Sequence, residues 1–143
     1  PYAKRYVCVD SSPKVVLAAA ERLKKWPTVS VMKADMHELP FGAAQFDLVL
    51  MMHALSYTKK PALVIEEAAR VLKPKGQLLL SCLMKHGHRS VVEPFGHENL
   101  GFSQKELIRH AEKAGLTVKH CEVVSRERRA PHFEILMLLA EKP

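Results

Sequence analysis

Apolar residues occur in short runs along this chain, and polar stretches rich in proline or glycine separate the runs. Residues 46–52 are apolar except for Asp47. A strand this apolar is buried on both faces, which is typical of a parallel sheet covered by helices. The same reasoning predicts strands at residues 6–9, 29–34, 46–51, 77–83, 117–124 and 133–140. Apolar residues at helical spacing predict helices at residues 13–26, 62–72 and 103–114.

Several predicted helices begin or end at a characteristic residue. Ser12 suits an N-cap, and Pro13 suits the first helical position. Ser103 and Glu106 have the spacing of a capping box, and Gly115 suits the residue that follows a helix. These local signals support the predicted start of the first helix and both ends of the last.

Two segments between the predicted elements are irregular in sequence. Residues 73–76, Lys-Pro-Lys-Gly, predict a turn that stops the second helix. Residues 84–102 predict a long loop, and loops of that length within a compact domain are usually functional. The element order predicts an α/β fold with a doubly wound, mostly parallel sheet. The last two strands have no helix between them, which predicts an antiparallel edge.

The composition limits the possible classes of protein. The 143 residues are 48% hydrophobic and 26% charged, which suits one globular domain spanning residues 1–143. No apolar run reaches 18 residues and no signal-peptide pattern is present, so we expect a cytoplasmic protein without a membrane span. The net charge is +7, but Lys and Arg are dispersed, which favours a solvated surface over direct nucleic-acid contact. The three cysteines are far apart and within predicted strands, which favours buried, reduced thiols.

Two carboxylates follow successive predicted strands. Asp10 ends the first strand and Asp35 ends the second, so the right-handed crossover between them should bring both to one rim of the sheet. Asp10 could accept both hydroxyls of a ribose, and Asp35 could accept the amine of adenine while the N–H of Met36 reaches a ring nitrogen. Alternatively, Asp10 caps the following helix and Asp35 begins a turn.

Five motifs together resemble class I S-adenosylmethionine-dependent methyltransferases of the type 11-like group. They are residues 9–13 (VDSSP), 34–41 (ADMHELPF), 45–50 (QFDLVL), 69–76 (ARVLKPKG) and 112–116 (EKAGL). Residues 86–103 resemble the subgroup that follows an ArsR-type winged-helix regulator domain. The resemblance implies a Rossmann-like fold and S-adenosylmethionine as cofactor. By position it implies ribose contacts by Asp10 and Ser11, adenine contacts by Asp35 and Met36, and a residue flanking the methionine part at Met51.

The family's first strand, first helix and Gly-rich loop would precede Pro1. The resemblance therefore implies a truncated methyltransferase domain that binds the cofactor poorly and is inactive by itself. It also implies that the strands ending at Asp10 and Met51 have open edges, through which a second copy could pair.

Other residues could bear on the chemistry. His53 and Tyr57 follow the strand at residues 46–51 and could contact or deprotonate an acceptor, or simply pack in the turn. His86, His88 and His97 with Glu93 could bind a metal, but histidines in a polar loop are more often surface or gating residues, so we expect no metal site. We expect methyl transfer to a small-molecule substrate chosen by loop 84–102. The alternatives are a nicotinamide enzyme, which would explain Asp10 but not Asp35 and Met36, and a non-enzymatic cofactor-sensing or dimerisation module of a regulator.

Overall fold

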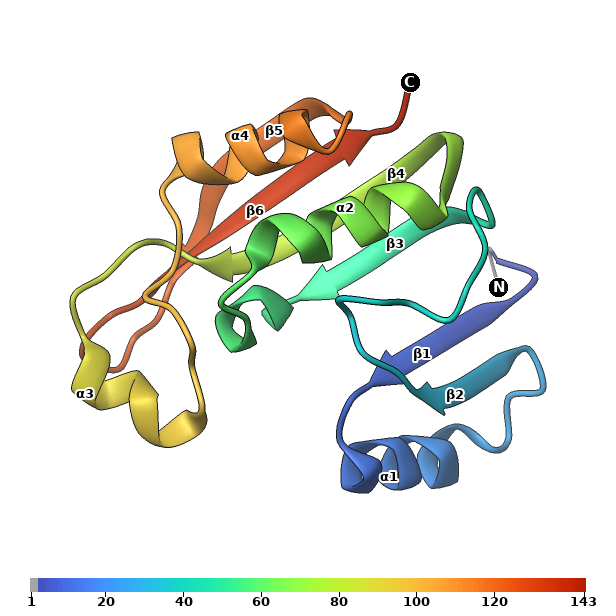
Figure 1. The fold of residues 1–143 in the computed structure, drawn as a ribbon. Helices are drawn as coiled ribbons and strands as arrows, with labels where there is room; N and C mark the ends of the chain where they lie inside the picture. The colour runs from blue at the N-terminus through green and yellow to red at the C-terminus, as the bar shows by residue number, and fades with distance from the viewer. Residues whose placement is uncertain (1–2) are drawn as a thin grey trace. The chain divides into compact units, whose positions relative to one another are not determined.

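A computed structural model of the chain describes residues 3–143, and the chain divides into two compact units between Pro40 and Phe41 (Figure 1). The first unit contains one helix and two strands, and the second contains a four-stranded sheet with its helices. The expected α/β class is confirmed. That the two units form one domain stays a prediction.

The first unit is a β-α-β crossover. Strand β1 (Tyr6–Asp10) and strand β2 (Val29–Lys33) pair in parallel, with Asp10 opposite Lys33. Helix α1 (Pro13–Leu23) connects them and begins as predicted, because the Ser12 hydroxyl accepts a hydrogen bond from the N–H of Val15 at 3.4 Å. The helix stops before the predicted Trp26, since a residue that precedes proline is disfavoured in the α conformation.

The second unit is a sheet with the strand order β3-β4-β6-β5. Strand β3 (Phe46–Met52) runs parallel to β4 (Leu72–Leu83). Strand β6 (Glu134–Glu141) is antiparallel to both β4 and β5 (Thr117–Arg126). The antiparallel C-terminal strand is therefore confirmed, but it lies inside the sheet rather than at its edge. The edge position belongs to β5, which runs parallel to β4.

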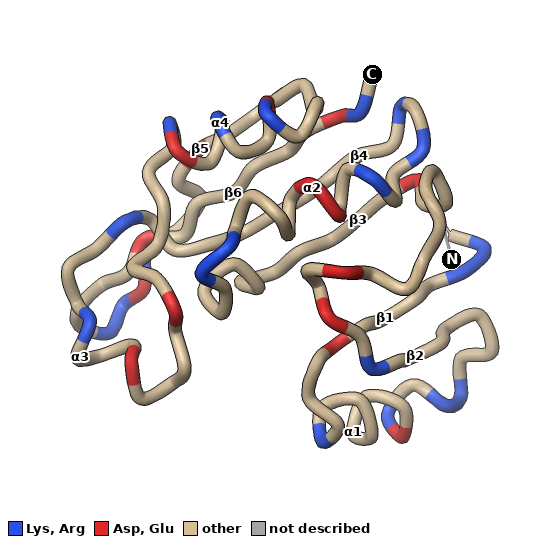
Figure 2. The backbone as a smooth tube through the Cα atoms, in the orientation of Figure 1, with Lys and Arg blue, Asp and Glu red and all other residues tan. Residues whose placement is uncertain are grey.

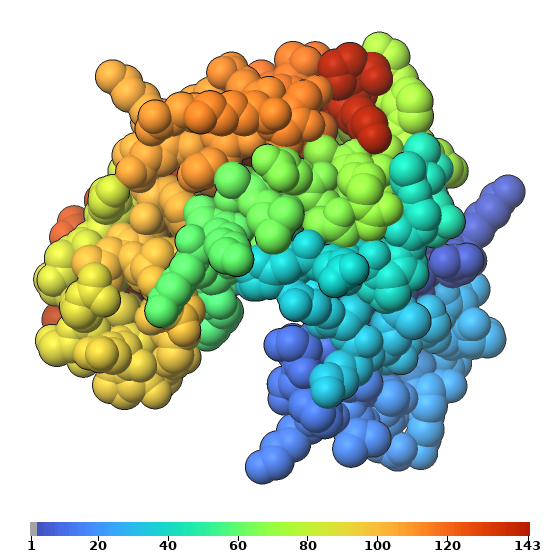
Figure 3. Space-filling view, in the orientation of Figure 1, coloured from blue at the N-terminus to red at the C-terminus, as the bar shows by residue number. Residues whose placement is uncertain are grey.

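Two helices cover one face of this sheet. Helix α2 (Pro61–Val71) and helix α4 (Gln104–Lys113) lie side by side and form a continuous surface (Figures 1 and 3). Beneath them is a core of fully buried aliphatic side chains, which includes Ile65, Leu78, Leu80, Leu107, Leu136 and Leu138. On β3, Leu48, Leu50 and Met52 alternate with the buried Met51, and they are half exposed.

The prediction of a turn at residues 73–76 is wrong, because these residues lie within strand β4. Strand β4 begins at Leu72, directly after α2, and residues 73–76 bulge out of the ladder, because Leu72 pairs with Phe46 while Gln77 pairs with Leu48. The bulge is held from outside, where the N–H of Lys75 donates to the carbonyl of Lys142 at 2.8 Å. A β-bulge can absorb the proline that a regular inner strand would exclude.

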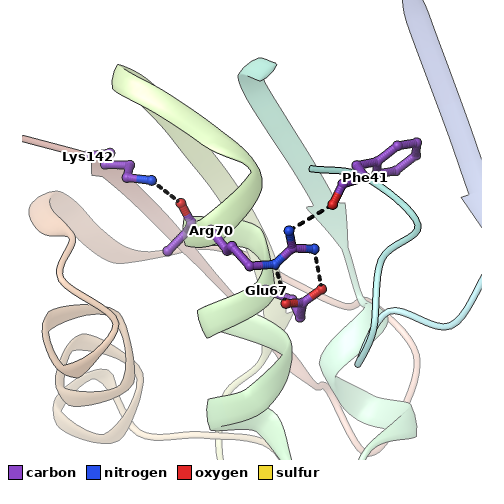
Figure 4. Close-up of polar contacts among 5 residues, drawn as sticks. Phe41, Glu67, Arg70 and Lys142 are labelled. Carbon is purple, nitrogen blue, oxygen red and sulfur yellow. Dashed lines mark hydrogen bonds and ion pairs between the residues drawn. The ribbon is translucent and has the colours of Figure 1, made fainter. Parts of the chain in front are cut away.

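Charged side chains fix the carboxyl end of α2 (Figure 4). Arg70 donates to both carboxylate oxygens of Glu67, at 2.6 and 2.9 Å, and to the carbonyl of Phe41 at 2.7 Å. The ammonium of Lys142 donates to the carbonyls of Ala69 and Leu72, each at 2.8 Å. The last carbonyls of a helix lack partners within the helix, so Lys142 acts as a cap supplied from the end of the chain.

The predicted long loop has short helical turns of its own. Residues 84–102 contain α3 (Arg89–Val92) and the 3-10 turn η2 (Glu93–Phe95). The loop closes on itself, because the N–H of Lys85 donates to the carbonyl of Phe102 at 3.0 Å and the N–H of His86 to that of Leu100 at 2.9 Å. The Ser103–Glu106 capping box that follows is present, as predicted.

The surfaces of both units carry dispersed charge (Figure 2), in agreement with the sequence. Every helix within residues 3–143 is too short or too polar to cross a membrane. Over the same residues, β1 pairs only with β2 and β3 pairs only with β4, so each of these strands has a free edge.

Candidate functional site

Asp10 and Asp35 lie at the same end of the β1–β2 pair. Asp10 is the last residue of β1, and the N–H of Ala34 donates to its carbonyl at 3.0 Å. Asp35 lies two residues after Lys33, the last residue of β2. The two carboxylates are therefore at the carboxyl ends of adjacent parallel strands. Both side chains are exposed. This is the position at which ligands bind in open α/β sheets.

Each carboxylate is oriented by its own loop. One oxygen of Asp10 accepts from the N–H of Ser12 at 2.8 Å. One oxygen of Asp35 accepts from the N–H of His37 at 2.8 Å and lies 2.6 Å from its Nδ1. These bonds use one of the two oxygens of each group, and a carboxylate has about four acceptor positions. Ser12 and not Asp10 caps α1, whereas Asp35 does begin a turn, because its carbonyl accepts from the N–H of Glu38 at 3.1 Å. Both carboxylates keep acceptor positions that a ligand could use.

Hydrogen bonds keep Asp35 ionised. The N–H of His37 lowers the pKa of the Asp35 carboxyl below its ordinary value, with help from the His37 ring. A carboxylate that stays charged is a better acceptor for a ligand donor such as an exocyclic amine. Ser11 is exposed beside Asp10, and Met36 is half buried beside Asp35.

Met51 has a different environment from these four residues. Its side chain is only 9% exposed and lies opposite Leu80 beneath the helices. Met51 belongs to the second unit, as do His53 and Tyr57, whereas Asp10 and Asp35 belong to the first. A cofactor contact by Met51 would therefore involve its main chain, and its role stays a prediction.

A cavity of about 290 Å³ lies in the second unit and brings His53 and Tyr57 together. His53 precedes the 3-10 turn η1 (Ala54–Tyr57) and Tyr57 is its last residue, and His53 has a left-handed backbone with φ of 57°. Such a conformation is uncommon outside glycine and is often found at functional sites. The lining comes from η1 and the residue before it, the end of β4, the 84–102 loop and the β5–β6 connection: His53, Ser56, Tyr57, Leu83, Val91, Val92, Phe95, His97, Glu127 and Phe133.

His97 is held against Tyr57 in this cavity. Their rings meet edge to face with centroids 5.3 Å apart. The Nδ1 atom of His97 is buried and has no hydrogen-bond partner among the described residues. Burial, and then the nearby His53, lower the pKa of His97. At neutral pH the His97 ring is therefore uncharged.

Loop 84–102 is fastened to η1 by hydrogen bonds. Asn99 donates from its side-chain amide to the carbonyls of Leu55 and Thr58, at 2.5 and 2.9 Å. The N–H of Glu98 donates to the carbonyl of Ser56 at 2.7 Å. The two segments that form much of the cavity thus support each other.

The histidines considered for a metal do not form one site. His86 stacks on His88 with centroids 5.8 Å apart and packs against Phe133, whereas His97 faces Tyr57. Among residues 3–143, no three His, Cys, Asp or Glu side chains converge as metal ligands would. The cysteines are free, and only Cys82 is fully buried, with its pKa raised to about 12 mainly by that burial.

The sequence reasoning missed part of this cavity. Glu127, Phe133 and Phe95 were not candidates, and His97 was considered as a metal ligand or, with greater weight, as a surface or gating residue. One signal was available, namely the length of the 84–102 loop, which supplies His97, Phe95, Val91 and Val92.

Comparison with known proteins identifies the family. A family model described as "Methyltransferase domain" matches residues 1–80, more than half of the chain. The chain belongs to the methyltransferase domain family. The resemblance stated from the sequence is thereby confirmed at this level, whereas the alternative of a non-enzymatic regulator module finds no support.

Individual relatives agree with this assignment. The domain is 33% identical over 87 residues to a demethylmenaquinone methyltransferase of Tropheryma whipplei, covering 61% of this chain and 35% of that protein. It is 32% identical over 97 residues to a "Probable S-adenosylmethionine-dependent methyltransferase" of Mycobacterium tuberculosis, covering 65% and 34% of the two chains. The chain thus spans about a third of the length of these relatives.

A solved structure shares the fold. The N-methyltransferase NodS from Bradyrhizobium japonicum, in complex with S-adenosyl-L-homocysteine, matches with a TM-score of 0.77 at 20% identity. The match covers 100% of this chain and 69% of NodS. The expected Rossmann-like methyltransferase fold is therefore confirmed.

Proposed function

We propose that the protein carrying this chain transfers a methyl group from S-adenosylmethionine to a small-molecule acceptor. The observation that carries the proposal is the pair Asp10 and Asp35 in a chain of the methyltransferase domain family: Asp10 ends β1, and Asp35 follows the end of the adjacent parallel strand β2 by two residues. The relative from M. tuberculosis, named as dependent on S-adenosylmethionine, and the NodS complex with the demethylated cofactor support this choice of cofactor.

The residues at the strand ends fit the adenosine part of that cofactor. Asp10 would accept the two ribose hydroxyls, with Ser11 beside it. Asp35 would accept the adenine amine, and the N–H of Met36 would donate to a ring nitrogen. Both carboxylates are exposed and pre-oriented by bonds from Ser12 and His37, so little ordering is needed when the ligand binds.

The second unit would supply the acceptor side. When bound, S-adenosylmethionine provides a methyl group on a sulfonium, and the protein contributes chiefly by holding the acceptor in line. Such alignment can be worth roughly 7–11 kcal/mol of the barrier. The cavity lined by His53, Tyr57 and His97 is the concave, largely apolar site in which a small acceptor could be oriented. His53 and Tyr57 remain candidates for contact with the acceptor.

Binding of S-adenosylhomocysteine to the full-length protein, measured by isothermal titration calorimetry, tests the proposal. A charge-assisted hydrogen bond contributes about 1.5–3 kcal/mol, so Asp10→Ala and Asp35→Ala should each weaken binding by roughly 10- to 150-fold without unfolding the protein. Asp47→Ala removes an exposed carboxylate from the second unit and serves as the control. If the unmodified full-length protein does not bind, or if neither variant weakens binding, the proposed site is wrong.

We also propose that the free edges of β1 and β3 can pair with additional backbone, including that of a second copy. Sedimentation at increasing protein concentration would detect such self-association. A monomer at every concentration would contradict pairing between copies.

A further inference from the structure

The cavity of the second unit has an unbalanced charge. Glu127 is the only formally charged residue among those lining it, and none of the lining residues is Lys or Arg. Arg126 and Arg128 flank Glu127 in the chain, but they are exposed and do not line the cavity. Glu127 is exposed like these arginines and like Arg129, so solvent screens all of these charges, and the distinction of Glu127 is that it alone among them lines the cavity.

The remaining lining is mostly aromatic and aliphatic. Tyr57, Phe95 and Phe133 each contribute a ring, and Tyr57 and Phe95 are 53% and 73% exposed. Large aromatic side chains left this exposed at the mouth of a cavity provide apolar surface that a ligand can cover. A cavity of about 290 Å³ is suited to a small ligand.

We propose that this cavity binds a primary or secondary amine carried on an aromatic or apolar body, with Glu127 and the aromatic rings holding the ammonium group. The inference rests on the proposed function, because it names the chemical class of the methyl acceptor.

Electrostatic interactions favour an amine over a carboxylate or a neutral alcohol as the ligand. An ammonium is attracted to the face of an aromatic ring within about 6 Å and forms a charge-assisted hydrogen bond with a carboxylate. A carboxylate-bearing acceptor would meet the charge of Glu127 and would find no cation in the lining to compensate for its lost hydration. A neutral alcohol would gain the apolar contacts but not the ionic one.

The state of His97 is compatible with a cationic ligand. A protonated ring would carry an N–H at Nδ1, and this atom is buried with no acceptor among the described residues. A buried donor without a partner is unfavourable, so the ring stays neutral and does not repel an ammonium.

Three probes of similar shape test the charge preference: phenethylamine, 2-phenylethanol and 3-phenylpropanoate. Calorimetric titration into the full-length protein without cofactor should show the amine binding at least about tenfold more tightly than the alcohol, with the carboxylate weakest. Equal binding of amine and alcohol, tighter binding of the carboxylate, or no binding of any probe would overturn the inference.

Glu127→Gln keeps the size of the side chain and removes its charge. It should weaken phenethylamine about tenfold or more and leave 2-phenylethanol unchanged. Glu122→Gln, an exposed acid on β5 that does not line the cavity, is the matched control. Phe95→Leu, at an exposed position where folding is not at risk, should weaken both the amine and the alcohol. An unchanged amine affinity in Glu127→Gln would refute the role of that carboxylate.

The probe titrations are independent of the cofactor titration. If S-adenosylhomocysteine binds but the amine does not, the acceptor class is wrong and the proposed function stands. If the amine binds but S-adenosylhomocysteine does not, the cavity is a binding site in a protein without the proposed activity.

Discussion

The rings of Tyr57 and His97 meet edge to face, with centroids 5.3 Å apart. Tyr57 ends the turn that follows β3, and His97 belongs to the loop that follows β4. Both segments contribute residues to the lining of the cavity, so neither could form it alone. The contact therefore depends on how firmly the 84–102 loop is attached to η1.

Asn99 should be the main attachment of that loop. Its amide donates to the carbonyls of Leu55 and Thr58, and its oxygen accepts from the N–H of Gly101 at 3.0 Å. Each net hydrogen bond is worth about 0.5–1.5 kcal/mol, so Asn99→Ala should lower the free energy of unfolding by about 1.5–4 kcal/mol. Urea denaturation would measure this change.

Gln104→Ala is the control for the Asn99 variant. Gln104 also donates its amide to a carbonyl, that of Cys121, but at an exposed position. Its loss should cost within about 0.5 kcal/mol. Equal costs for the two variants would show that the loop attachment does not depend on Asn99.

Gly101 should tolerate no side chain. Its φ is +79°, and an added Cβ would lie 2.5 Å from the carbonyl oxygen of Met84 and 2.6 Å from that of Leu83. Gly101→Ala should therefore destabilise the protein by about 2–4 kcal/mol, through both backbone strain and a clash with backbone atoms. The decrease in free energy of unfolding is again the measurement.

Two other glycines separate these causes. Gly96 has φ of +80° but nothing within 4 Å of an added Cβ, so Gly96→Ala should cost only the strain, about 1–2 kcal/mol. Gly87 has open space and no positive φ, and Gly87→Ala should be nearly neutral. If Gly101→Ala and Gly96→Ala cost the same, the clash contributes nothing.

The parts of the fold that could be predicted from the sequence depend on interactions between residues close together in the chain. The Ser12 cap, the Ser103–Glu106 capping box and the helix end before Gly115 each depend on neighbours within one turn of helix. The start of β4 at Leu72 was not predicted, because it depends on residues that are distant in the chain. The bulge at residues 73–76 depends on Phe46 and Lys142, which are far away in the chain, and the sequence signals Pro74 and Gly76 are equally typical of a turn.

In the candidate site, too, some residues could be predicted from the local sequence and others could not. His53 and Tyr57 were predictable because residues just after a buried parallel strand lie at the functional edge of a sheet. Glu127 and Phe133 lie in the connection between β5 and β6, and they reach the cavity because β6 is inserted antiparallel between β4 and β5. No local pattern encodes that insertion, so their contribution required the structure.

Lys142 should stabilise α2 from outside the helix. Its ammonium donates to the carbonyl of Ala69, in the last turn of α2, and to that of Leu72, the residue directly after the helix. Hydrogen bonds to charged groups are worth about 1.5–3 kcal/mol, and Lys142→Met keeps most of the apolar stem, so this variant should lose about that amount. Lys105→Met, at an exposed position of α4, provides the control. Equal urea midpoints for the two variants would show that the cap is not significant.

Three histidines should make the protein less stable as the pH falls from 7.5 to 5.5. Burial is the main cause that lowers the pKa of His86, His97 and His110 below the ordinary value of 6.5. The unfolded chain then binds more protons than the folded protein just below pH 6.5, so the stabilisation is present above that pH and is lost as the pH falls toward the folded values. The carboxyls with lowered pKa, Asp35 and Glu106, have ordinary pKa values of 3.8 and 4.5 and lose their contribution to stability at lower pH.

Urea midpoints at pH 7.5 and 5.5 should therefore differ, and His110→Gln should reduce the difference. His120→Gln, an exposed position on β5, is the control; a pH dependence that is the same in both variants would show that burial of His110 is not responsible.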